Sequence, residues 1–477
     1  MTSKTKKEKN LQSTRDRSLF LEHCLKHQKL YLSLLFLMMV GVIFLTNQGA
    51  EKVFFYGEES YAHLVAAEEI NDNNFSFTTG GSYPLYLLTK ILPVVYVNVI
   101  PPLLTIISLL SLGYILRKKE FSQEFIFFFL LLLILSPFFM TLTTTISTAT
   151  IFFFLFLLTF ALLIQSKRYW RYLAILSVAV IPLIDQFSGL ITVLALLFYG
   201  FSLKKSERGV SWCSLGVVLL MLLGSTIWLN TSFIQGPFHE EHLARDLISD
   251  LGGKSGISFF VLILGVLGFL LAWPKKRIIL APLYLFLPLL IPAYIYNTEA
   301  ISELSIIIIF FASEALLFLI NYKWQLPTLR QFTFFLLLLG IFFSSLAFIS
   351  RLSETGLSMQ EQEVLAWMKE NIPSGTIIAS FPEDADYVSY FAQKTVFFTF
   401  HDQDKQKELD NTAIFKATYV DQLFPILVRN NISYIYLSTT AKEKLSADQG
   451  LLFLLKNERF KLLHSAGEVE IWGFEQR

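Results

Sequence analysis

Long apolar runs alternate with short polar connections over the first 350 residues. A transmembrane helix needs roughly 20 apolar residues to cross about 30 Å of hydrocarbon. Candidate runs fall at about 29–47, 94–116, 123–140, 150–166, 171–185, 188–203, 211–229, 257–273, 278–296, 304–321 and 331–350. The runs on either side of residues 185–188 are close enough to form a tight helical hairpin. The pattern predicts a polytopic α-helical membrane protein with about 11 transmembrane helices.

The pattern changes after residue 350. Residues 351–477 carry 31 of the 77 charged residues, a density typical of a soluble domain. Short strands are expected at 376–380, 395–400 and 433–437, helices before Pro373 and near 386–393 and 419–430, and a hairpin-like pair at the end. Short strands that alternate with helices predict a small C-terminal α/β domain with a mostly parallel sheet.

Three parts of the chain follow from these patterns. Residues 1–28 form a basic polar segment, residues 29–350 a transmembrane domain, and residues 351–477 the α/β domain. Two polar connections within the transmembrane domain are long enough to carry a site, at about 48–93 and 230–256.

Composition excludes several classes of protein. Hydrophobic residues make up 54% of the chain and charged residues 16%, and 47 residues are Phe. A soluble enzyme of this length could not bury so much apolar surface, and a disordered chain would be far less hydrophobic. The net charge of +1 gives no argument for nucleic-acid binding. Two isolated cysteines form neither a disulfide framework nor a thiolate metal site.

The distribution of charge is more informative than its sum. With the N-terminus in the cytoplasm and the helices alternating in direction, 22 basic residues fall on the cytoplasmic side. Only Lys52, Lys90, Arg245 and Lys254 fall outside before the tail. Cytoplasmic connections of membrane proteins are enriched in Lys and Arg. We therefore expect a multi-pass protein of the cell membrane with an extracytoplasmic C-terminal domain.

The first external loop contains a pair of carboxylates. Gly57 allows a sharp turn after the first span, which places Glu58 and Glu59 near the membrane surface. The residues from Tyr61 to Ile70 have helical spacing and predict a helix along the interface, with Tyr61 as an aromatic anchor. Such a pair could bind a metal ion or act as a general base, although paired acids on a loop are also commonly a solvated surface.

This arrangement resembles the GT-C superfamily of integral membrane glycosyltransferases, which includes oligosaccharyltransferase catalytic subunits and protein O-mannosyltransferases. The stretch Gly57-Glu-Glu-Ser-Tyr-Ala-His-Leu64 is similar to the Gly-Asp-Glu-x-Tyr-Tyr-His-Leu stretch of prokaryotic members. Residues 247–256 and 364–373 resemble segments of archaeal-type members. The resemblance covers essentially the whole chain in architecture but few residues in motif.

The resemblance implies a function. The protein would transfer a sugar, with inversion, from a polyprenyl-phosphate or polyprenyl-pyrophosphate donor to an extracytoplasmic protein, lipid or glycan. Glu58 falls where the family usually has its catalytic Asp, and Glu59 falls at the adjacent acid. A divalent cation, Mg or Mn, held by Glu58 and Glu59 is the cofactor that the family implies.

The sequence departs from the family pattern in two places. Residues 139–148 contain no carboxylate where oligosaccharyltransferases have an acidic motif, and the tail lacks the WWDYG motif. These departures argue against a true oligosaccharyltransferase and leave open a non-catalytic member.

Further polar residues are candidates for binding substrate or the lipid phosphate of the donor. They are Tyr61, His63, His239, His242, Arg245 and Arg351. His63 lies one helical turn after Glu59, and Arg351 could clamp a phosphate at the edge of the last span. Ordinary alternatives are a surface histidine for His63, a solvated loop for the residues of the second loop, and an interfacial anchor for Arg351.

Two acids close to the apolar runs have two interpretations each. Asp185 either supports the site or simply forms the turn of the helical hairpin. Glu314, within the run at 304–321, either lines a substrate path or lies near a helix end.

The alternative function is a non-catalytic GT-C-like protein or a transporter of lipid-linked glycans. Transporters often have interrupted spans in corresponding halves, but the prolines that interrupt spans here show no such correspondence. A cavity lined by Glu58 or Glu59 would favour the enzyme. The expected partners are the lipid bilayer, a polyprenyl-linked sugar donor and an extracytoplasmic acceptor, and no nucleic acid is expected.

Overall fold

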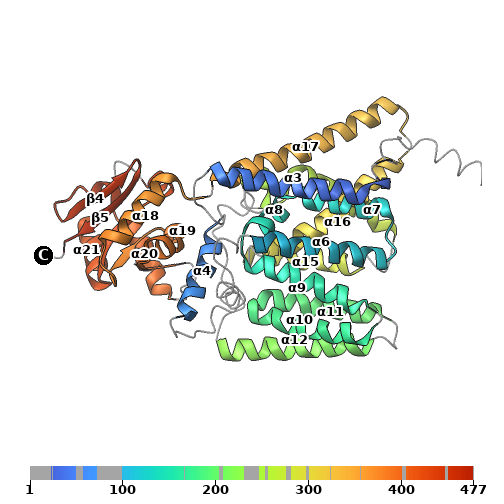
Figure 1. Cartoon of the computed structure of the whole chain (residues 1–477), viewed down its shortest axis with the longest axis horizontal. Coiled ribbons are helices and arrows are strands. Elements are labelled where there is room, and N and C mark those ends of the chain that lie inside the picture. The colour runs from blue at the N-terminus through green and yellow to red at the C-terminus, as the bar shows by residue number, and fades with distance from the viewer. Residues whose placement is uncertain are drawn as a thin grey trace, which may run out of the picture. The chain divides into compact units, whose positions relative to one another are not determined.

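The chain folds into two compact units, a helical bundle and a unit that contains a sheet (Figure 1). The first comprises Met1–Leu45, Val99–Thr144 and Thr148–Arg351, and the second Thr46–Asn98, Thr145–Ser147 and Leu352–Arg477. The computed structural model describes residues 23, 25–49, 57–71, 99–165, 167–203, 208–229, 247–252, 256–275, 281–296, 300–322, 324–354, 356–399, 404–445 and 450–475.

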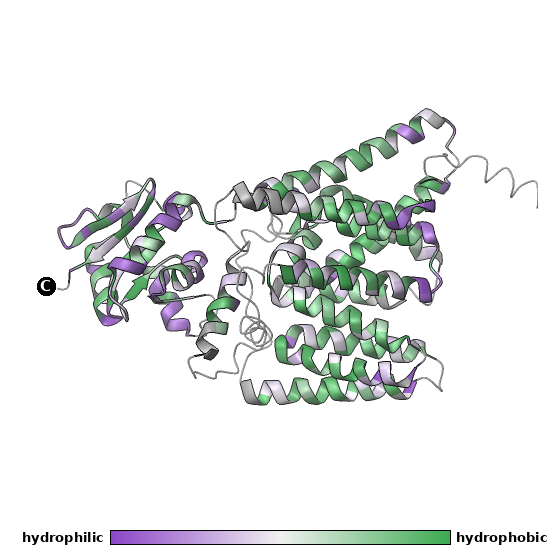
Figure 2. Ribbon diagram, viewed as in Figure 1, coloured by the Kyte–Doolittle hydropathy of each residue, from purple (hydrophilic) through white to green (hydrophobic). Residues whose placement is uncertain are grey.

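Helices of the first unit coincide with the predicted apolar runs, and the ribbon in Figure 2 shows that hydrophobic residues predominate along them. They are α3 (Gln28–Gly49), α6 (Ile100–Lys118), α7 (Gln123–Ile134), α8 (Pro137–Thr144), α9 (Thr148–Leu163), α10 (Arg168–Ile184), α11 (Gln186–Ser202), α12 (Arg208–Leu229), α14 (Phe259–Ala272), α15 (Ala281–Tyr296), α16 (Ile301–Asn321) and α17 (Pro327–Glu354). Short 3₁₀ turns lie at η4 (Ser249–Leu251) and η5 (Trp273–Lys275).

Four helices within the described ranges are long and apolar enough to cross a membrane. They lie at Ile100–Lys118, Arg208–Ile227, Ile301–Asn321 and Thr328–Leu352. The pair α7 and α8 adds a fifth if it forms one span, and five shorter apolar helices accompany them. These helices support the prediction of an α-helical membrane protein. The predicted number of about 11 transmembrane helices stays a prediction.

The single run predicted at 123–140 is two helices, bent by 63° between α7 and α8. Pro137 begins α8 and has no backbone N–H with which to continue α7. The hydroxyl of Ser136 instead donates to the carbonyl oxygen of Leu133 at 2.7 Å and accepts from the N–H of Phe139 at 3.2 Å. The break therefore has its polar groups satisfied inside the bundle.

The hairpin predicted around residues 185–188 is formed by α10 and α11, which pack together and against α12 (Figure 1). Asp185 is the single residue between the two helices. Its carboxylate accepts a hydrogen bond from the N–H of Ser188 at 2.5 Å and so caps α11. Asp185 therefore forms the hairpin turn, one of the two roles expected for it.

The sheet of the second unit has the strand order β2-β1-β3-β5-β4. The strands β2 (Thr395–Val396), β1 (Ile377–Ala379) and β3 (Ile432–Leu437) are parallel, and β5 (Val469–Phe474) and β4 (Phe460–Ala466) add antiparallel pairings. The expectation of a mostly parallel sheet is wrong, because the terminal hairpin contributes as many pairings as the parallel strands do.

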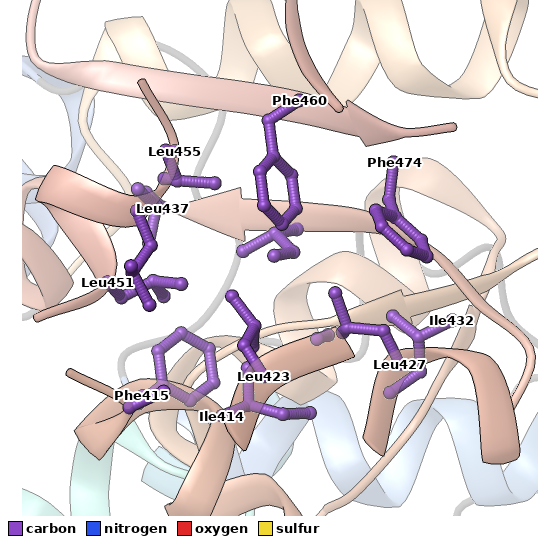
Figure 3. Packing of buried hydrophobic residues seen from close by; sticks show 14 of the residues in the cluster. Ile414, Phe415, Leu423, Leu427, Ile432, Leu437, Leu451, Leu455, Phe460 and Phe474 are labelled. Atoms are coloured by element: carbon purple, nitrogen blue, oxygen red, sulfur yellow. The ribbon is translucent and has the colours of Figure 1, made fainter. Parts of the chain in front are cut away.

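Helices pack on this sheet around a common hydrophobic core (Figure 3). The helices α20 (Lys405–Lys416), α21 (Val420–Arg429), α22 (Thr439–Lys444) and α23 (Leu451–Leu454) contribute to this core. Helix α18 (Met359–Asn371) packs instead against β4, β5 and the π-helix η8 (Val388–Ala392), which continues α19 (Pro382–Tyr387). The core side chains include Ile414, Leu423, Leu427 and Phe460. The second unit therefore has a core of its own.

Candidate functional site

The acidic motif opens helix α4 (Glu58–Asn71), which belongs to the second unit. Gly57 precedes the helix with a φ of 77°, a left-handed conformation that favours glycine. The backbone of Glu58 and Glu59 forms the first helical turn, and their side chains lie outside the described part of the structure. Carboxylates in the first turn are stabilised as anions by the positive end of the helix dipole.

A turn that follows α8 in the sequence meets the beginning of α4. The N–H of Ile146 donates a hydrogen bond of 3.0 Å to the hydroxyl of Ser60, which is fully buried. Thr145 and Ser147, the polar residues of this turn, are buried as well. Residues 145–147 belong to the stretch in which this chain has no carboxylate and oligosaccharyltransferases have a second acidic motif. This turn therefore lies beside the start of α4, and both segments belong to the second unit.

Tyr61 is fully buried and joins α4 to α19 and η8. Its ring centre lies 5.1 Å from that of Tyr387, 5.3 Å from that of Tyr390 and 5.2 Å from that of Phe391. Leu64 continues this buried face one turn later. The expectation of an anchor at the membrane surface is therefore wrong, since the ring packs inside the protein. A role for Tyr61 in substrate binding stays a prediction.

His63 lies on the same helix and is half-buried. It follows Glu59 by one helical turn, a spacing that predicts a contact between the two side chains. The side chain of Glu59 lies outside the described part of the structure, so this contact stays a prediction. The candidates His239, His242 and Arg245 lie outside the described residues.

Arg351 lies near the end of α17 in the first unit, where it is half-buried. One of its Nη atoms donates to the hydroxyl of Ser249 at 3.3 Å, and its guanidinium lies 5.9 Å from the ring centre of Phe348. Ser249 belongs to a turn whose next residue, Asp250, is hydrogen-bonded to Ser344 of α17. Across the described residues Arg351 therefore has a neutral hydrogen-bond partner and no ion pair.

A half-buried acid that the sequence did not single out lies in the first unit as well. Glu303, in the first turn of α16, interacts electrostatically with Asp185, and its Oε2 atom is buried without a hydrogen-bond partner among the described residues. The neighbouring side chains of Phe187, Leu247 and Ile301 pack together. The apolar run was predicted to begin at residue 304, which left Glu303 just outside it.

Glu314 lies deeper in α16 and is 8% exposed. It interacts electrostatically with Tyr284 of α15. Both interpretations of this residue, in a substrate path or near a helix end, stay predictions.

No group of three or more His, Cys, Asp or Glu side chains within the described ranges could hold a metal ion. The turn beside α4 offers only the hydroxyl and backbone oxygens of Thr145, Ile146 and Ser147. Binding of Mg or Mn by Glu58 and Glu59 therefore stays a prediction.

The fold described above, an apolar helical bundle with a small C-terminal sheet, is similar to that of solved oligosaccharyltransferases. Solved structures with this fold come from the archaeon Archaeoglobus fulgidus. The apo form of its oligosaccharyltransferase matches with a TM-score of 0.62 at 12% identity, over 86% of this chain and 69% of that chain. The resemblance to GT-C glycosyltransferases inferred from the sequence is thus confirmed at the level of the fold.

Two complexes extend the comparison. The archaeal oligosaccharyltransferase AglB with an inhibitory peptide and a dolichol-phosphate matches with a TM-score of 0.62 at 12% identity, over 96% of this chain and 75% of that chain. The form tethered to an acceptor peptide with the NVT sequon has a TM-score of 0.59 at 11% identity, over 94% and 74% of the two chains. No protein-family model and no curated protein sequence matches the chain.

Proposed function

We propose that the protein is a membrane glycosyltransferase of the GT-C type, which transfers a sugar from a polyprenyl-phosphate or polyprenyl-pyrophosphate donor to an acceptor outside the cytoplasm. The observation that carries the proposal is the oligosaccharyltransferase fold with an acidic motif at the start of α4. Archaeal structures with this fold hold a dolichol-phosphate in one case and an acceptor peptide in another.

Glu58 is the leading candidate for the general base, and Glu59 is the second. A carboxylate in the first turn of α4 is a group that can take the proton of the attacking acceptor group. The acceptor attacks the anomeric carbon while the lipid phosphate leaves from the opposite face, so that the configuration inverts without a covalent enzyme intermediate. A phosphate leaving group is a weak base and needs little help from an acid.

Positive charge favours departure of the lipid phosphate. Arg351 is suited to this role because its only hydrogen-bond partner among the described side chains is the neutral Ser249. A divalent cation, Mg or Mn, would supply further positive charge if Glu58 and Glu59 hold it.

The test of the proposal is release of polyprenyl phosphate from a panel of dolichyl- and undecaprenyl-linked sugars by the purified full-length protein. We expect Glu58→Gln to lower the turnover by about 10²–10⁴-fold, the usual contribution of a general base. Glu59→Gln is the parallel variant, and Glu363→Gln, an exposed acid on α18, is the control. Full turnover by both Glu58→Gln and Glu59→Gln proteins would refute the assignment.

One observation favours a second candidate, a non-catalytic protein or a transporter of lipid-linked glycans. The turn beside α4 presents the hydroxyls of Thr145 and Ser147 where oligosaccharyltransferases carry an acid. Binding of the lipid-linked sugar without release of polyprenyl phosphate, or its movement between leaflets of a reconstituted vesicle, would support this candidate over the enzyme.

A further inference from the structure

A cavity of about 180 Å³ lies among helix ends of the first unit, at the end of the bundle opposite Asp185. Lys118 and Lys119 reach it from the end of α6, Arg171 from the first turn of α10, and Tyr199 and Ser211 from α11 and α12. The volume is several times the roughly 30 Å³ that one water molecule takes in the liquid. It can therefore hold a small polar group rather than one or two waters.

Positive charge dominates this cavity. Three cations line it, and none of the described lining residues is a carboxylate. Nζ of Lys119 lies 5.1 Å from the ring centre of Tyr199, which fixes the amine at the cavity wall. Nε of Arg171 donates to the carbonyl oxygen of Gln165 at 2.9 Å, which orients the guanidinium and leaves its Nη atoms for a further acceptor.

Two helix N-termini add to the positive potential. The residue that precedes α10, Lys167, makes no side-chain capping hydrogen bond, and the first turns of α10 and α12 contain no acidic residue. Helix N-termini favour anions, whereas these carry Arg168 and Arg208 instead. The charge at this point therefore favours an anion, and none of the described residues that line the cavity is acidic.

Ser211 gives an independent indication of a ligand. It is 2% exposed and lines the cavity, and its hydroxyl oxygen has no hydrogen-bond partner in the described part of the chain. Buried hydroxyls are nearly always hydrogen-bonded, because burial without a partner costs free energy. A group bound in the cavity would supply that partner.

Aromatic side chains mark the depth of the cavity in a bilayer. Tyr169 and Tyr172 on α10 and Phe201 and Trp212 near the facing ends of α11 and α12 are all exposed. Aromatic residues of this kind gather at the level of the lipid headgroups. The distribution of Lys and Arg assigns this end of the bundle to the cytoplasmic side.

We propose that this cavity is a binding site for a phosphate ester, carried either by an anionic membrane lipid or by a small soluble molecule of the cytoplasmic side. Lys118, Lys119 and Arg171 would neutralise the phosphate through charge-assisted hydrogen bonds, and the hydroxyl of Ser211 would donate to one of its oxygens. The site is separate from the acidic motif of α4 and does not depend on the proposed transferase activity.

The test is a binding measurement on the full-length protein in nanodiscs of phosphatidylcholine, with fluorescent phosphatidylglycerol, unlabelled phosphatidic acid and glycerol 3-phosphate as probes. The variant Lys118→Gln/Arg171→Gln removes two cations from the wall. We expect it to weaken binding by roughly tenfold or more. The control Arg117→Gln/Lys167→Gln removes the same charge from exposed residues at the same end of the bundle and should bind as the native protein does.

Ser211→Ala provides a second variant in case the double variant fails to fold, since it removes only the unpaired hydroxyl. We expect it to weaken binding severalfold with no change in net charge. Displacement of the label by phosphatidic acid alone identifies a lipid ligand, and displacement by glycerol 3-phosphate as well identifies a soluble ester; either result supports the site. Equal binding by the Lys118→Gln/Arg171→Gln variant and its control, or unchanged binding by Ser211→Ala, would overturn the proposal.

Discussion

At the scale of single residues, the burial of Tyr61 is what holds the acidic motif to the second unit. The ring contacts three aromatic side chains of α19 and η8. We expect Tyr61→Ala to cost about 3–5 kcal/mol, as truncation of a buried aromatic commonly does, and to expose α4 to protease. Tyr61→Phe keeps the ring and should stay close to the native protein. Thermal unfolding in detergent and limited proteolysis measure both effects, and equal protection of Tyr61→Ala would contradict this account of the contact.

The sequence predicted the helix that carries Tyr61 but not what covers its buried face. Tyr61, Leu64 and Ala67 are spaced along one side of a helix, and all three are buried. A membrane surface and a protein surface produce the same apolar spacing, so the pattern could not tell them apart. The covering residues, Tyr387 and Tyr390, lie far along the chain. Only the tertiary structure reveals this contact.

Asp410 in the second unit makes stability depend on pH. Burial by itself raises the pKa of the carboxyl group, but hydrogen bonds from Asn430, Gln406 and Arg429, together with the charge of Arg429, lower the pKa below its ordinary value of 3.8. The ionised group therefore stabilises the folded state at neutral pH. This contribution is lost as the pH falls through the folded pKa, below about 4.

We therefore expect Asp410→Asn to lower the midpoint of thermal unfolding at pH 7. The difference from the native protein should shrink as the pH is lowered below 3.8. An exposed acid, Glu458, changed to Gln provides the control. A difference that stays constant from pH 7 to acid would show that the charge of Asp410 contributes nothing.

At the scale of elements, a close approach of two helices organises the first unit. A Cβ placed on Gly268 of α14 would lie 1.7 Å from the carbonyl oxygen of Phe311 in α16, and one placed on Gly265 would lie 2.6 Å from Cγ2 of Ile308. The two helices can pack this closely only because glycine stands at the contact.

Gly268→Ala should therefore force α14 and α16 apart. Overpacking commonly lowers the free energy of unfolding by about 1–3 kcal/mol. Because the added methyl group would meet backbone atoms of Phe311, we expect a loss near the upper end of that range. Gly216→Ala on α12 is the matched control, because nothing lies within 4 Å of its added methyl group. We expect a lower unfolding midpoint and less folded protein for Gly268→Ala alone. Equal behaviour of the two variants would contradict the packing of α14 on α16.

The sequence predicts best those elements whose pattern of apolar residues is strong. Where the structure describes the apolar runs of the sequence, each of them is helical over most of its length, because burial in lipid or protein leaves few other ways to satisfy the backbone. The helix α20 was missed, since Lys405–Lys416 is mostly polar and shows a weak apolar period. The sheet was misjudged because strand patterns do not encode the direction of pairing, which the hairpin of β4 and β5 decides.

At the scale of the whole molecule, the uneven distribution of Lys and Arg predicts the orientation in the membrane. A fluorescent protein fused before Met1 should fluoresce in the cytoplasm, and alkaline phosphatase fused after Arg477 should be active outside it. The exchanged fusions are the controls and should be silent. Active phosphatase at the N-terminus, or fluorescence at the C-terminus, would reverse the assignment.

The second unit is assembled from chain segments that the ribosome makes at very different times. Helix α4 comes early, the turn at 145–147 follows, and the residues after 351 come last. Tyr61 meets its aromatic partners only when η8 has been synthesised. While the helices of the first unit are synthesised and inserted, the acidic motif therefore lacks the contacts between Tyr61 and η8. A chain that stopped before η8 would therefore carry the motif without the aromatic side chains that cover Tyr61.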